Sequence, residues 1–499
     1  MARFNFMGSG ARRVRALVLA RPRAWFGACV ILAALIGAAL AIGVYEADRI
    51  QARLTSLLPK TERPVADSKA VTWRRMETAL LTLERADIPL GDVDGNTIGG
   101  GIAAFAGHII HVSPKGYVGA LPLDGGTLSY SENRISFGLT PDAYGNRINF
   151  NPRHIRVHDV LVRPVDGAEP TRAEILVSHH RFVPESQSVC LVVSRGTLTR
   201  GDAGIVFPQT WEEVYRLDAC VSMPAIAWNF DGLTSGGEMV WLDGTRLLLS
   251  VGDFSLYREV DNDAVTRPAP DNDLGKIVEL DLETGAATPY AQGVRNPQGL
   301  AWGVDGRLWE TEHGPQGGDE VNLIRRGGDY GWPHVSMGTE YGAPRSPLPA
   351  GTASLGRHEG YTRPAFAFVP SIGISGLSAV EAKGGFDPWH GDLVAASLRE
   401  QSLYRLRPAD DRIVYAEKIP LGLRLRDVIQ LPDGRLAALS DLDTVVLLRG
   451  VSPSAPLPDT PELVLAGLGE IAPREVHPAQ ARGTEAWGLE LYRAHCQGC

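Results

Sequence analysis

The chain has 499 residues, which is more than one ordinary hydrophobic core accommodates and predicts at least two structured units. Its net charge of -9 argues against a broad nucleic-acid-binding surface, while 44% hydrophobic and 21% charged residues indicate a globular protein. The 56 glycines and 34 prolines favour an all-β chain with many turns.

The amino-terminal segment has the pattern of a membrane anchor. Arginines precede the first acidic residue, Glu46, and residues 25–45 carry no charge. About 20 apolar residues span a bilayer as a helix, so we expect a transmembrane helix over residues 25–45 in the inner membrane. The basic residues 1–24 are then a cytoplasmic tail, and the rest of the chain lies in the periplasm. A cleaved signal peptide is the alternative, although its apolar region is usually ~7–15 residues.

Residues 46–86 are predicted to form a short helical stalk. Apolar side chains recur at approximately helical spacing between Ala66 and Arg85. The stalk connects the anchor to a folded body that begins at Asp87.

Three Asp-Gly pairs, each followed by apolar residues, divide this body. They are Asp243-Gly244, Asp305-Gly306 and Asp433-Gly434. Asp-Gly between apolar runs is a strong hairpin signal, and the pairs recur at about 60 residues or twice that distance. Residues 87–450 are therefore expected to hold the repeated blades, about six of them, of a β-propeller.

The five cysteines are too few for a disulfide scaffold. Two of them, Cys190 and Cys220, can pair in an oxidising compartment. A pair of buried free thiols is the alternative.

Four histidines are grouped in the first half of the body, as His154 with His158 and His179 with His180. Their spacing fits no tight zinc pattern. They are therefore interpreted as ordinary strand and loop residues.

The stretch Glu312–Pro333 holds the densest set of polar and aromatic residues. Its many Gly, Pro, Asp and Asn residues predict a loop rather than the interior of a helix or strand. Carboxylates and free carbonyls in one tight loop suit a hard cation such as calcium. A rigid surface loop with Asx turns is the alternative.

Together with the motif at Arg295–Ala301, this loop resembles the signature of the glucose/sorbosone dehydrogenase family. Members of that family are six-bladed β-propellers that use pyrroloquinoline quinone (PQQ) and calcium to oxidise sugars. The likeness is clear over residues 233–448 and fainter over residues 87–220. It implies a six-bladed, all-β propeller that oxidises an aldose or polyol substrate.

The resemblance implies a role for each matching residue. Gly314 and Pro315 match the carbonyls that hold calcium. Glu320 and Tyr330 match positions around a second, structural calcium. The positions that match cofactor contacts are Arg295, Asn296, His313, Asp319 and Arg399. The first of these corresponds to the arginine over the quinone oxygen, where a side chain that stays charged is physically apt.

The base histidine of the family is absent from its usual place. Counting back from Gly252 and Asp253, its position holds Thr234, whose hydroxyl is no general base near neutral pH. We therefore predict that Asp253 or His313 takes the substrate proton.

A second difference concerns the basic residues that bind the carboxylates of PQQ. Phe366 and Phe368 lie where the family can carry a lysine, which predicts weaker affinity for PQQ or a different cofactor. Arg424 and Arg426 are further cations in this region. Blade packing and surface charge are the alternative role for these two arginines.

The carboxyl-terminal part has two predicted segments. Residues 451–480 have the composition of a linker, and residues 481–499 resemble the first helix of a c-type cytochrome. Haem c attachment needs Cys-x-x-Cys-His, and Cys496 and Cys499 stand here without the histidine. Haem c is expected only if the chain continues, and a simple redox Cys-x-x-Cys pair is the alternative.

These features predict a membrane-anchored periplasmic oxidoreductase that uses PQQ and calcium, with a cytochrome or quinone as electron acceptor. The main alternative, which Thr234 supports, is a propeller that binds calcium and a carbohydrate or protein without redox chemistry. A calcium-dependent lactone hydrolase on a similar propeller is a weaker interpretation, because Arg295 has no evident use there.

Overall fold

The computed structural model describes residues 72–91, 98–138, 155–165, 167, 170–222, 232–256, 269–339, 357–441 and 444–451. The predicted tail, the anchor at residues 25–45, and Cys496 and Cys499 lie outside these stretches, as does the linker beyond Val451. Among the residues described, no helix combines the length and the apolar character that crossing a bilayer requires.

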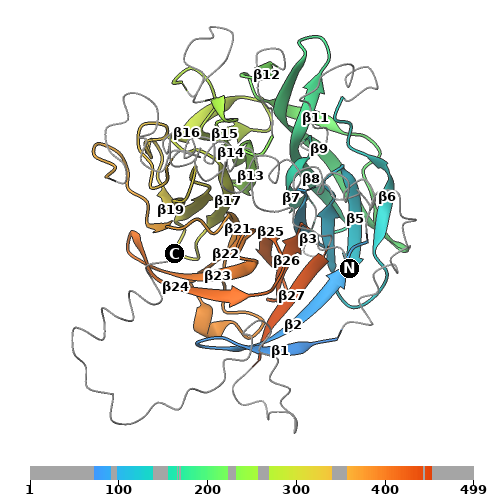
Figure 1. The fold of residues 1–499 in the computed structure, drawn as a ribbon. Helices are drawn as coiled ribbons and strands as arrows, with labels where there is room; N and C mark the ends of the chain where they lie inside the picture. The colour runs from blue at the N-terminus through green and yellow to red at the C-terminus, as the bar shows by residue number, and fades with distance from the viewer. Residues whose placement is uncertain are drawn as a thin grey trace, which may run out of the picture. The chain divides into compact units, whose positions relative to one another are not determined.

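Six antiparallel sheets, each of which is one blade, build the described part of the chain (Figure 1). Blade A holds β3 (Gly101–Phe105), β4 (His108–Val112), β5 (Tyr117–Pro122) and β6 (Ser129–Arg134). Blade B holds β7 (Val157–Pro164), β8 (Arg172–Val183), β9 (Ser188–Gly201) and β10 (Gly204–Val206), with β11 (Glu212–Arg216) and β12 (Val221–Ser222) paired to β9. Blade C holds β13 (Gly236–Trp241), β14 (Arg246–Val251), β15 (Lys276–Asp281) and β16 (Ala287–Gln292).

The second half of the ring follows the same plan. Blade D holds β17 (Pro297–Trp302), β18 (Leu308–Glu312), β19 (Asp319–Ile324) and β20 (Phe366–Phe368). Blade E holds β21 (Ile374–Ala379), β22 (Leu393–Ser397), β23 (Ser402–Ala409) and β24 (Arg412–Pro420), with the short 3-10 helix η5 (Asp387–Trp389) after β21. Blade F holds β25 (Leu425–Gln430), β26 (Leu436–Ser440), β27 (Thr444–Val451), β2 (Thr82–Pro89) and β1 (Arg74–Glu77).

The first strands of the blades pack against one another in a closed ring. The order of contacts is β3, β7, β13, β17, β21, β25 and again β3. The prediction of an all-β, six-bladed β-propeller is confirmed.

The predicted Asp-Gly pairs are the turns between the first and second strands of blades C, D and F. In the blade D turn, the Asp305 carboxylate accepts the Arg307 N–H at 3.1 Å, and Gly306 has a φ of 76°. The Asp433 carboxylate likewise accepts the Arg435 N–H at 3.0 Å. The recurrence in the sequence is therefore the recurrence of one hairpin in each blade.

The prediction of a helical stalk is wrong where the structure can test it. Residues 72–91 contain β1 and β2, and β2 pairs with β27 to complete blade F (Figure 1). Leu83, Ala86 and Ile88 on β2 are buried, because the blade covers the apolar side chains that helical spacing appeared to assign to one helix face. The propeller therefore begins before Asp87.

The prediction that Glu312–Pro333 lacks regular structure is also wrong in part. Strand β19 runs through Asp319–Ile324, and all six of its residues are buried. Val321, Leu323 and Ile324 supply the apolar packing that the surrounding glycines and acids obscured.

Blade B is the most extended of the six sheets. Strands β8 and β9 have 12 and 14 residues, and their buried apolar residues belong to a core shared with blades A and C. A disulfide joins Cys190 on β9 to Cys220, which precedes β12. The predicted pair is therefore present in the structure.

Polar side chains connect the inner strands of neighbouring blades. The Asp159 carboxylate on β7 accepts the Met239 N–H of β13 at 2.9 Å, and the Asp427 carboxylate on β25 accepts the Ile102 N–H of β3 at 2.9 Å. Both aspartates lie at bulges of their strands. These bonds fix the inner rim on which the predicted site residues lie.

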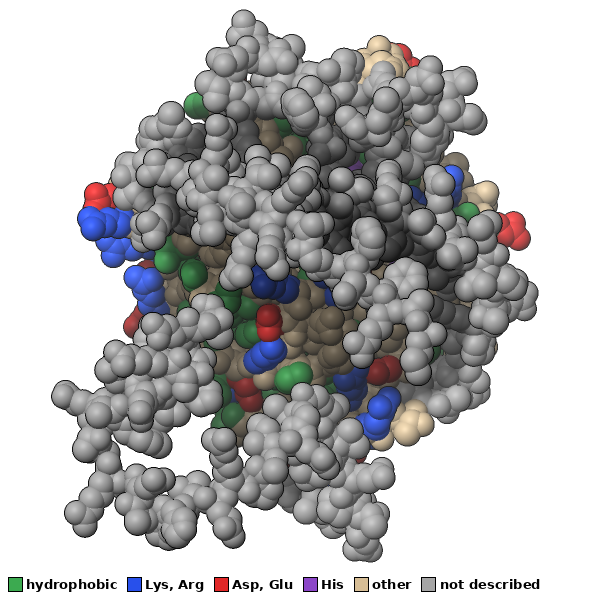
Figure 2. All heavy atoms as spheres, viewed as in Figure 1, with side chains coloured by type: hydrophobic (Ala, Val, Ile, Leu, Met, Phe, Trp, Pro, Cys, Tyr) green, Lys and Arg blue, Asp and Glu red, His purple; other side chains and the backbone are tan. Residues whose placement is uncertain are grey.

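At the surface, ion pairs such as Arg325–Asp411, at 2.6 Å, mix the two signs of charge. Figure 2 shows basic and acidic side chains of the described residues lying next to one another on the face that it presents.

Candidate functional site

The two sequence motifs meet because of one hairpin. Strands β17 and β18 are antiparallel, and Pro297 at the start of β17 lies opposite Glu312 at the end of β18. The residues just outside the strands are therefore also neighbours, and the His313 N–H donates to the Asn296 carbonyl at 3.1 Å. The predicted residues before β17 and after β18 are brought together.

Arg295 is held rigidly at this junction. Its Nη1 donates to the carbonyls of His313 and Gly314, at 3.0 Å each, and its guanidinium lies 5.3 Å from the ring centre of Trp332. The residue is 7% exposed, and its Nε has no hydrogen-bond partner among the described residues. A permanent positive charge with one unused N–H therefore faces the site.

Asp253 lies against the same arginine, after β14. Its N–H donates to the Arg295 carbonyl at 2.9 Å, and its carboxylate accepts the indole N–H of Trp332 at 2.9 Å. Burial raises the pKa of Asp253, and the charge of Arg295 opposes that shift. Thr234 hydrogen-bonds to this carboxylate and contacts the Ser255 hydroxyl at 3.0 Å, so it occupies the position that counting back from Asp253 predicts.

Asp319 fixes the loop that carries the predicted calcium ligands. Its carboxylate accepts the Gly314 N–H at 3.3 Å and the Ser371 hydroxyl at 2.6 Å. It also accepts the N–H groups of Ile372 and Ile374, at 3.0 Å each, next to blade E. With four donors on a fully buried carboxylate, this side chain acts in the structure as a positioning residue.

His313 is the second predicted base. Burial lowers its pKa to about 4, with the charge of Asp319 opposing the shift and that of Arg295 adding to it. The imidazole is therefore neutral near pH 7.

Three buried carboxylates lie side by side on β18 and β19. The strand register places Glu310 opposite Asn322 and Glu312 opposite Glu320. The Asn322 amide donates to Glu310 at 3.0 Å and to Glu312 at 3.3 Å, while Glu320 lies 3.7 Å from His358. Burial, followed by the charge of the neighbouring carboxylates, raises the pKa of Glu310 and Glu320. Burial likewise raises the pKa of Glu312 to about 7.

This cluster borders a cavity of about 10 Å³, which is the size of one water molecule. Glu312, Glu320, Gly314 and Tyr330 line it, so three of the four predicted calcium positions meet here, and Pro315 is buried beside them. Oxygen-rich and acidic surroundings suit calcium. The fit is incomplete, because the carbonyl of Gly314 accepts a hydrogen bond from arginine. In addition, no group of three His, Cys, Asp or Glu residues in the described part has metal-binding geometry.

The predicted cations differ in how they are used. Arg399 is exposed, and its Nη1 donates to the Ser371 carbonyl at 3.3 Å, which places it beside the loop anchor. Arg424 and Arg426 instead share the buried carboxylate of Asp441, at 3.2 and 2.9 Å. The first arginine is available to a ligand, whereas the other two are already paired.

Phe366 and Phe368 form β20 at the edge of blade D. The ring of Phe368 packs edge-on against Tyr404 at a centroid distance of 5.2 Å. Phe368 therefore belongs to the apolar packing between blades D and E. This packing accommodates an aromatic side chain in the region where the family can carry a lysine.

Sequence analysis missed two parts of this site. Trp332 contacts both Arg295 and Asp253, although it lies far from them along the chain. Glu312 accepts N–H groups from Arg295 and Asn296. The position of Glu312 directly before His313 was the available signal.

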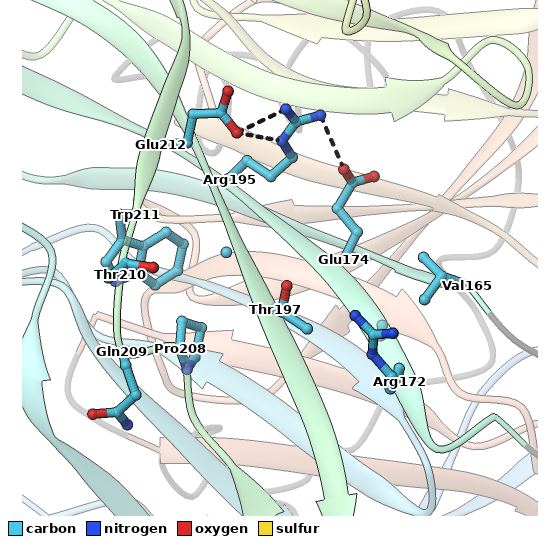
Figure 3. Close-up of a pocket in the computed structure, with 12 residues that line it drawn as sticks. Val165, Arg172, Glu174, Arg195, Thr197, Pro208, Gln209, Thr210, Trp211 and Glu212 are labelled. Atoms are coloured by element: carbon cyan, nitrogen blue, oxygen red, sulfur yellow. Dashed lines mark hydrogen bonds and ion pairs between the residues drawn. The ribbon is translucent and has the colours of Figure 1, made fainter.

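A separate pocket lies on blade B. It has a volume of about 400 Å³, and Figure 3 shows Arg195 between Glu174 and Glu212 near the ring of Trp211. None of the predicted site residues line it.

Comparisons with known proteins agree with the geometry. The model of the glucose/sorbosone dehydrogenase family matches residues 227–449. An uncharacterized protein of Synechocystis sp. is 34% identical over 233 residues, which cover 43% of this chain and 55% of that protein. The aldose sugar dehydrogenase YliI of Escherichia coli is 30% identical over 234 residues, which cover 44% of this chain and 60% of that protein. The chain thus spans little more than half the length of these relatives.

A shorter segment is more similar to a quinoprotein. Over 74 residues, 13% of this chain and 16% of the relative, it is 55% identical to quinoprotein glucose dehydrogenase B of Acinetobacter calcoaceticus. The crystal structure of a glucose dehydrogenase aligns with a TM-score of 0.55 and 25% identity, covering 71% of this chain and 97% of that chain. The resemblance to the glucose/sorbosone dehydrogenase family is therefore confirmed, and with it the propeller fold.

Proposed function

We propose that this protein is a PQQ- and calcium-dependent oxidoreductase that oxidises an aldose or polyol. The observation that carries the proposal is the fixed guanidinium of Arg295, which lies between the loop carbonyls and Trp332 at the meeting point of the two motifs. The names of two relatives, an aldose sugar dehydrogenase and a quinoprotein glucose dehydrogenase, support the substrate class and the cofactor.

Arg295 has the charge and geometry that a quinone cofactor needs. Its unused Nε–H can donate to an oxygen on which negative charge develops, and burial strengthens that interaction. Arg399, which donates to the Ser371 carbonyl beside the loop anchor, supplies an exposed cation for a carboxylate of the cofactor. PQQ, when bound, supplies the two-electron acceptor, and the protein supplies position and charge.

Calcium is proposed to bind beside Glu312 and Glu320. Carboxylates that face each other across strands repel one another unless protons or a cation neutralise them. The raised pKa values of both groups support a site built for a cation.

We also propose that the propeller lies in the periplasm, tethered by residues 25–45, and delivers electrons to a cytochrome or quinone. The basic residues before the apolar stretch support the orientation. The Cys190–Cys220 disulfide supports an oxidising compartment.

A non-redox propeller that binds calcium and a carbohydrate is the second candidate. Thr234 favours it, because the hydroxyl beside Asp253 cannot act as a general base near neutral pH. The rigid, unused N–H of Arg295 favours the enzyme.

Reconstitution with PQQ and calcium tests the proposal. The full chain is titrated with PQQ in the presence and absence of calcium, and the quinone absorbance is followed on addition of aldoses and polyols. Calcium-dependent binding with substrate-dependent bleaching supports the dehydrogenase. Sugar binding without PQQ binding supports the second candidate.

A further inference from the structure

Two histidines of blade B form a buried pair near the inner rim. The Nε2 atoms of His158 on β7 and His180 on β8 are 3.1 Å apart, and the two rings meet edge-to-face at 4.3 Å. Their strands are paired, and Val157 lies opposite His179. A bulge between Val157 and Asp159 contains His158. His180 is fully buried, whereas His158 is only partly buried.

The pair lies against the turn from which the base histidine of the family is missing. The Nε2 of His180 is 2.7 Å from the hydroxyl of Ser235, which follows Thr234 in the chain. Two residues later, a Cβ on Gly237 would lie 2.4 Å from the Cβ of His158, and Gly237 has a φ of 113°. Glycine at this position lets the imidazole of His158 approach the turn directly.

The same turn contacts the motif at the start of β17. The Gly236 N–H donates to the Asn296 side chain at 3.4 Å, and the Gln298 amide donates to the same oxygen at 3.0 Å. A small cavity is lined by His158, Gly236, Gln298 and Arg426. The histidine pair therefore adjoins the Arg295–Asn296 junction through one turn and one shared cavity.

A common electrostatic environment also connects the pair with the site. The charges of Arg156 and Arg426 lower the pKa of His158 and also that of His313. Two imidazoles from blades B and D therefore lie within electrostatic range of the same two guanidinium groups. This is expected if both border one space at the inner rim.

We infer that His158, positioned by His180, is the proton acceptor that replaces the missing base histidine; this inference rests on the proposed sugar-oxidising function. In the step, the substrate hydroxyl loses its proton to His158 and the carbon that bears it loses a hydride to the quinone acceptor. PQQ, when bound, would supply the two-electron acceptor, and the alcohol carbon would become a carbonyl carbon. The charges and atoms balance without a further reactant.

The ring atoms assign the roles of the two histidines. In this proposal the Nε2–H of neutral His158 donates to the Nε2 of His180, 3.1 Å away, which leaves Nδ1 as the atom that takes the proton. The imidazolium then donates from Nε2 to His180, which stabilises it. His180 contacts Ser235 and is fully buried, so it acts as a positioning residue.

The surroundings keep the acceptor unprotonated before reaction. Burial lowers the pKa of His158, and the charges of His180, Arg156, Arg426 and His179 lower it further. The nearby acids are Asp159, the next residue of β7, and Glu238 and Asp427, which line the same small cavity as His158. Burial raises the pKa of all three, and so reduces the negative charge that would oppose this shift.

The other two predicted bases are less suitable. Asp253 has its carboxylate bonded to the Trp332 indole and the Ser255 N–H. His313 is held within the Arg295 junction, where its N–H donates to the Asn296 carbonyl and its carbonyl accepts from Arg295. His158 is a partly exposed imidazole whose Nε2 lies 3.1 Å from a second imidazole, that of His180, and whose Cβ packs against the turn at Gly237.

The test uses the full chain loaded with PQQ and calcium. The rate at which sugar bleaches the bound quinone is measured across pH by stopped flow, and PQQ affinity is measured separately. His158→Asn is expected to lower the limiting rate by roughly 10²–10⁴-fold with PQQ affinity unchanged. His180→Asn is expected to shift the pH dependence with a smaller loss, and His111→Asn, a buried histidine of blade A, is the control.

The outcomes separate this inference from the proposed function. A wild-type chain that no sugar reduces overturns both. A reactive wild type with His158→Asn equal to His111→Asn overturns only the role of the pair. If His158→Asn fails to fold, nitrogen NMR of the ligand-free wild type decides. A proton on Nε2 of neutral His158 supports the inference, and a proton on Nδ1 overturns it.

Discussion

Blade B and blade D share one sheet order but bury ionisable groups of opposite kind. Blade B buries His179, whose pKa burial lowers to about 4. Blade D buries Glu312, whose pKa burial raises to about 7. Each group is driven toward its neutral form, because the low-dielectric interior penalises charge of either sign. The buried histidines of blade B reach neutrality by losing protons, whereas the buried glutamates of blade D do so by holding protons or a cation.

The two blades thus differ in what they contribute: blade B adds rigidity to the fold, and blade D presents charge. Blade B adds long strands and a disulfide to an apolar core. Blade D, where it meets blade C, adds fixed charge at Arg295 and a loop anchored by Asp319. Four substitutions sharpen this contrast or break it.

The largest effect is expected from Arg295→Met. Loss of the fixed guanidinium removes a preorganised charge, so turnover with PQQ, calcium and an artificial acceptor is expected to fall about 10²–10³-fold. Arg325→Ala, which removes an exposed ion pair of blade D, is the matched control. Equal turnover of the two variants would place the chemistry away from this junction.

The next effect concerns stability and blade B alone. Replacing Cys190 and Cys220 together by Ala opens a loop with a sequence separation of 30 and is expected to lower the free energy of unfolding by roughly 3–4 kcal/mol. Denaturant unfolding with and without reductant measures it. The reductant should destabilise the wild type and leave the double variant unchanged. PQQ affinity should stay the same, and a parallel loss would show that blade B also shapes the cofactor site.

A smaller effect depends on pH. The pKa of His179 is about 4 in the folded chain and 6.5 in the unfolded chain, so between these values the unfolded chain binds a proton that the folded chain excludes. The contribution of neutral His179 to the free energy of unfolding is therefore fully present above pH 6.5. It is lost as the pH falls, by about 2 kcal/mol at pH 5. In His179→Asn, denaturant unfolding should show a shallower loss between pH 7 and 5. His390→Asn, at an exposed position, should keep the wild-type slope; identical slopes in both would refute the assignment.

The smallest effect tests the repeated hairpin. Gly306 has a φ of 76° with open space around its Cβ direction, so Gly306→Ala is expected to cost about 1 kcal/mol through backbone strain alone. Gly244, at the matching turn of blade C, has open space and no such backbone conformation. Gly244→Ala should leave the unfolding midpoint unchanged or slightly raised. Equal losses at both sites would mean that strain does not distinguish the two turns.

Local signals predicted much of the fold. The Asp-Gly turns identify the hairpins because their hydrogen bonds lie within three residues of each other. The closing strand β2 was missed because its partner β27 lies at the other end of the body. Helical spacing of apolar residues cannot be distinguished from a strand whose two faces are both covered.

The site was predictable only where two motifs share one hairpin. Counting back from Asp253 placed Thr234 correctly, since both residues belong to the β13–β14 unit. The partners Trp332 and His158 come from other parts of the ring, and packing between blades brings them together. Contacts between different blades cannot be predicted from the spacing of residues within one segment.

The pairing of β2 with β27 determines when the propeller can close during synthesis. Arg449 and Glu84, which form an ion pair across it, are 365 positions apart in the chain. At a synthesis rate of about 5–20 residues per second, β2 waits roughly 20 to 70 s for its partner. The circle cannot close until nearly the whole body has been made, so the earliest strand of the propeller is among the last to be secured.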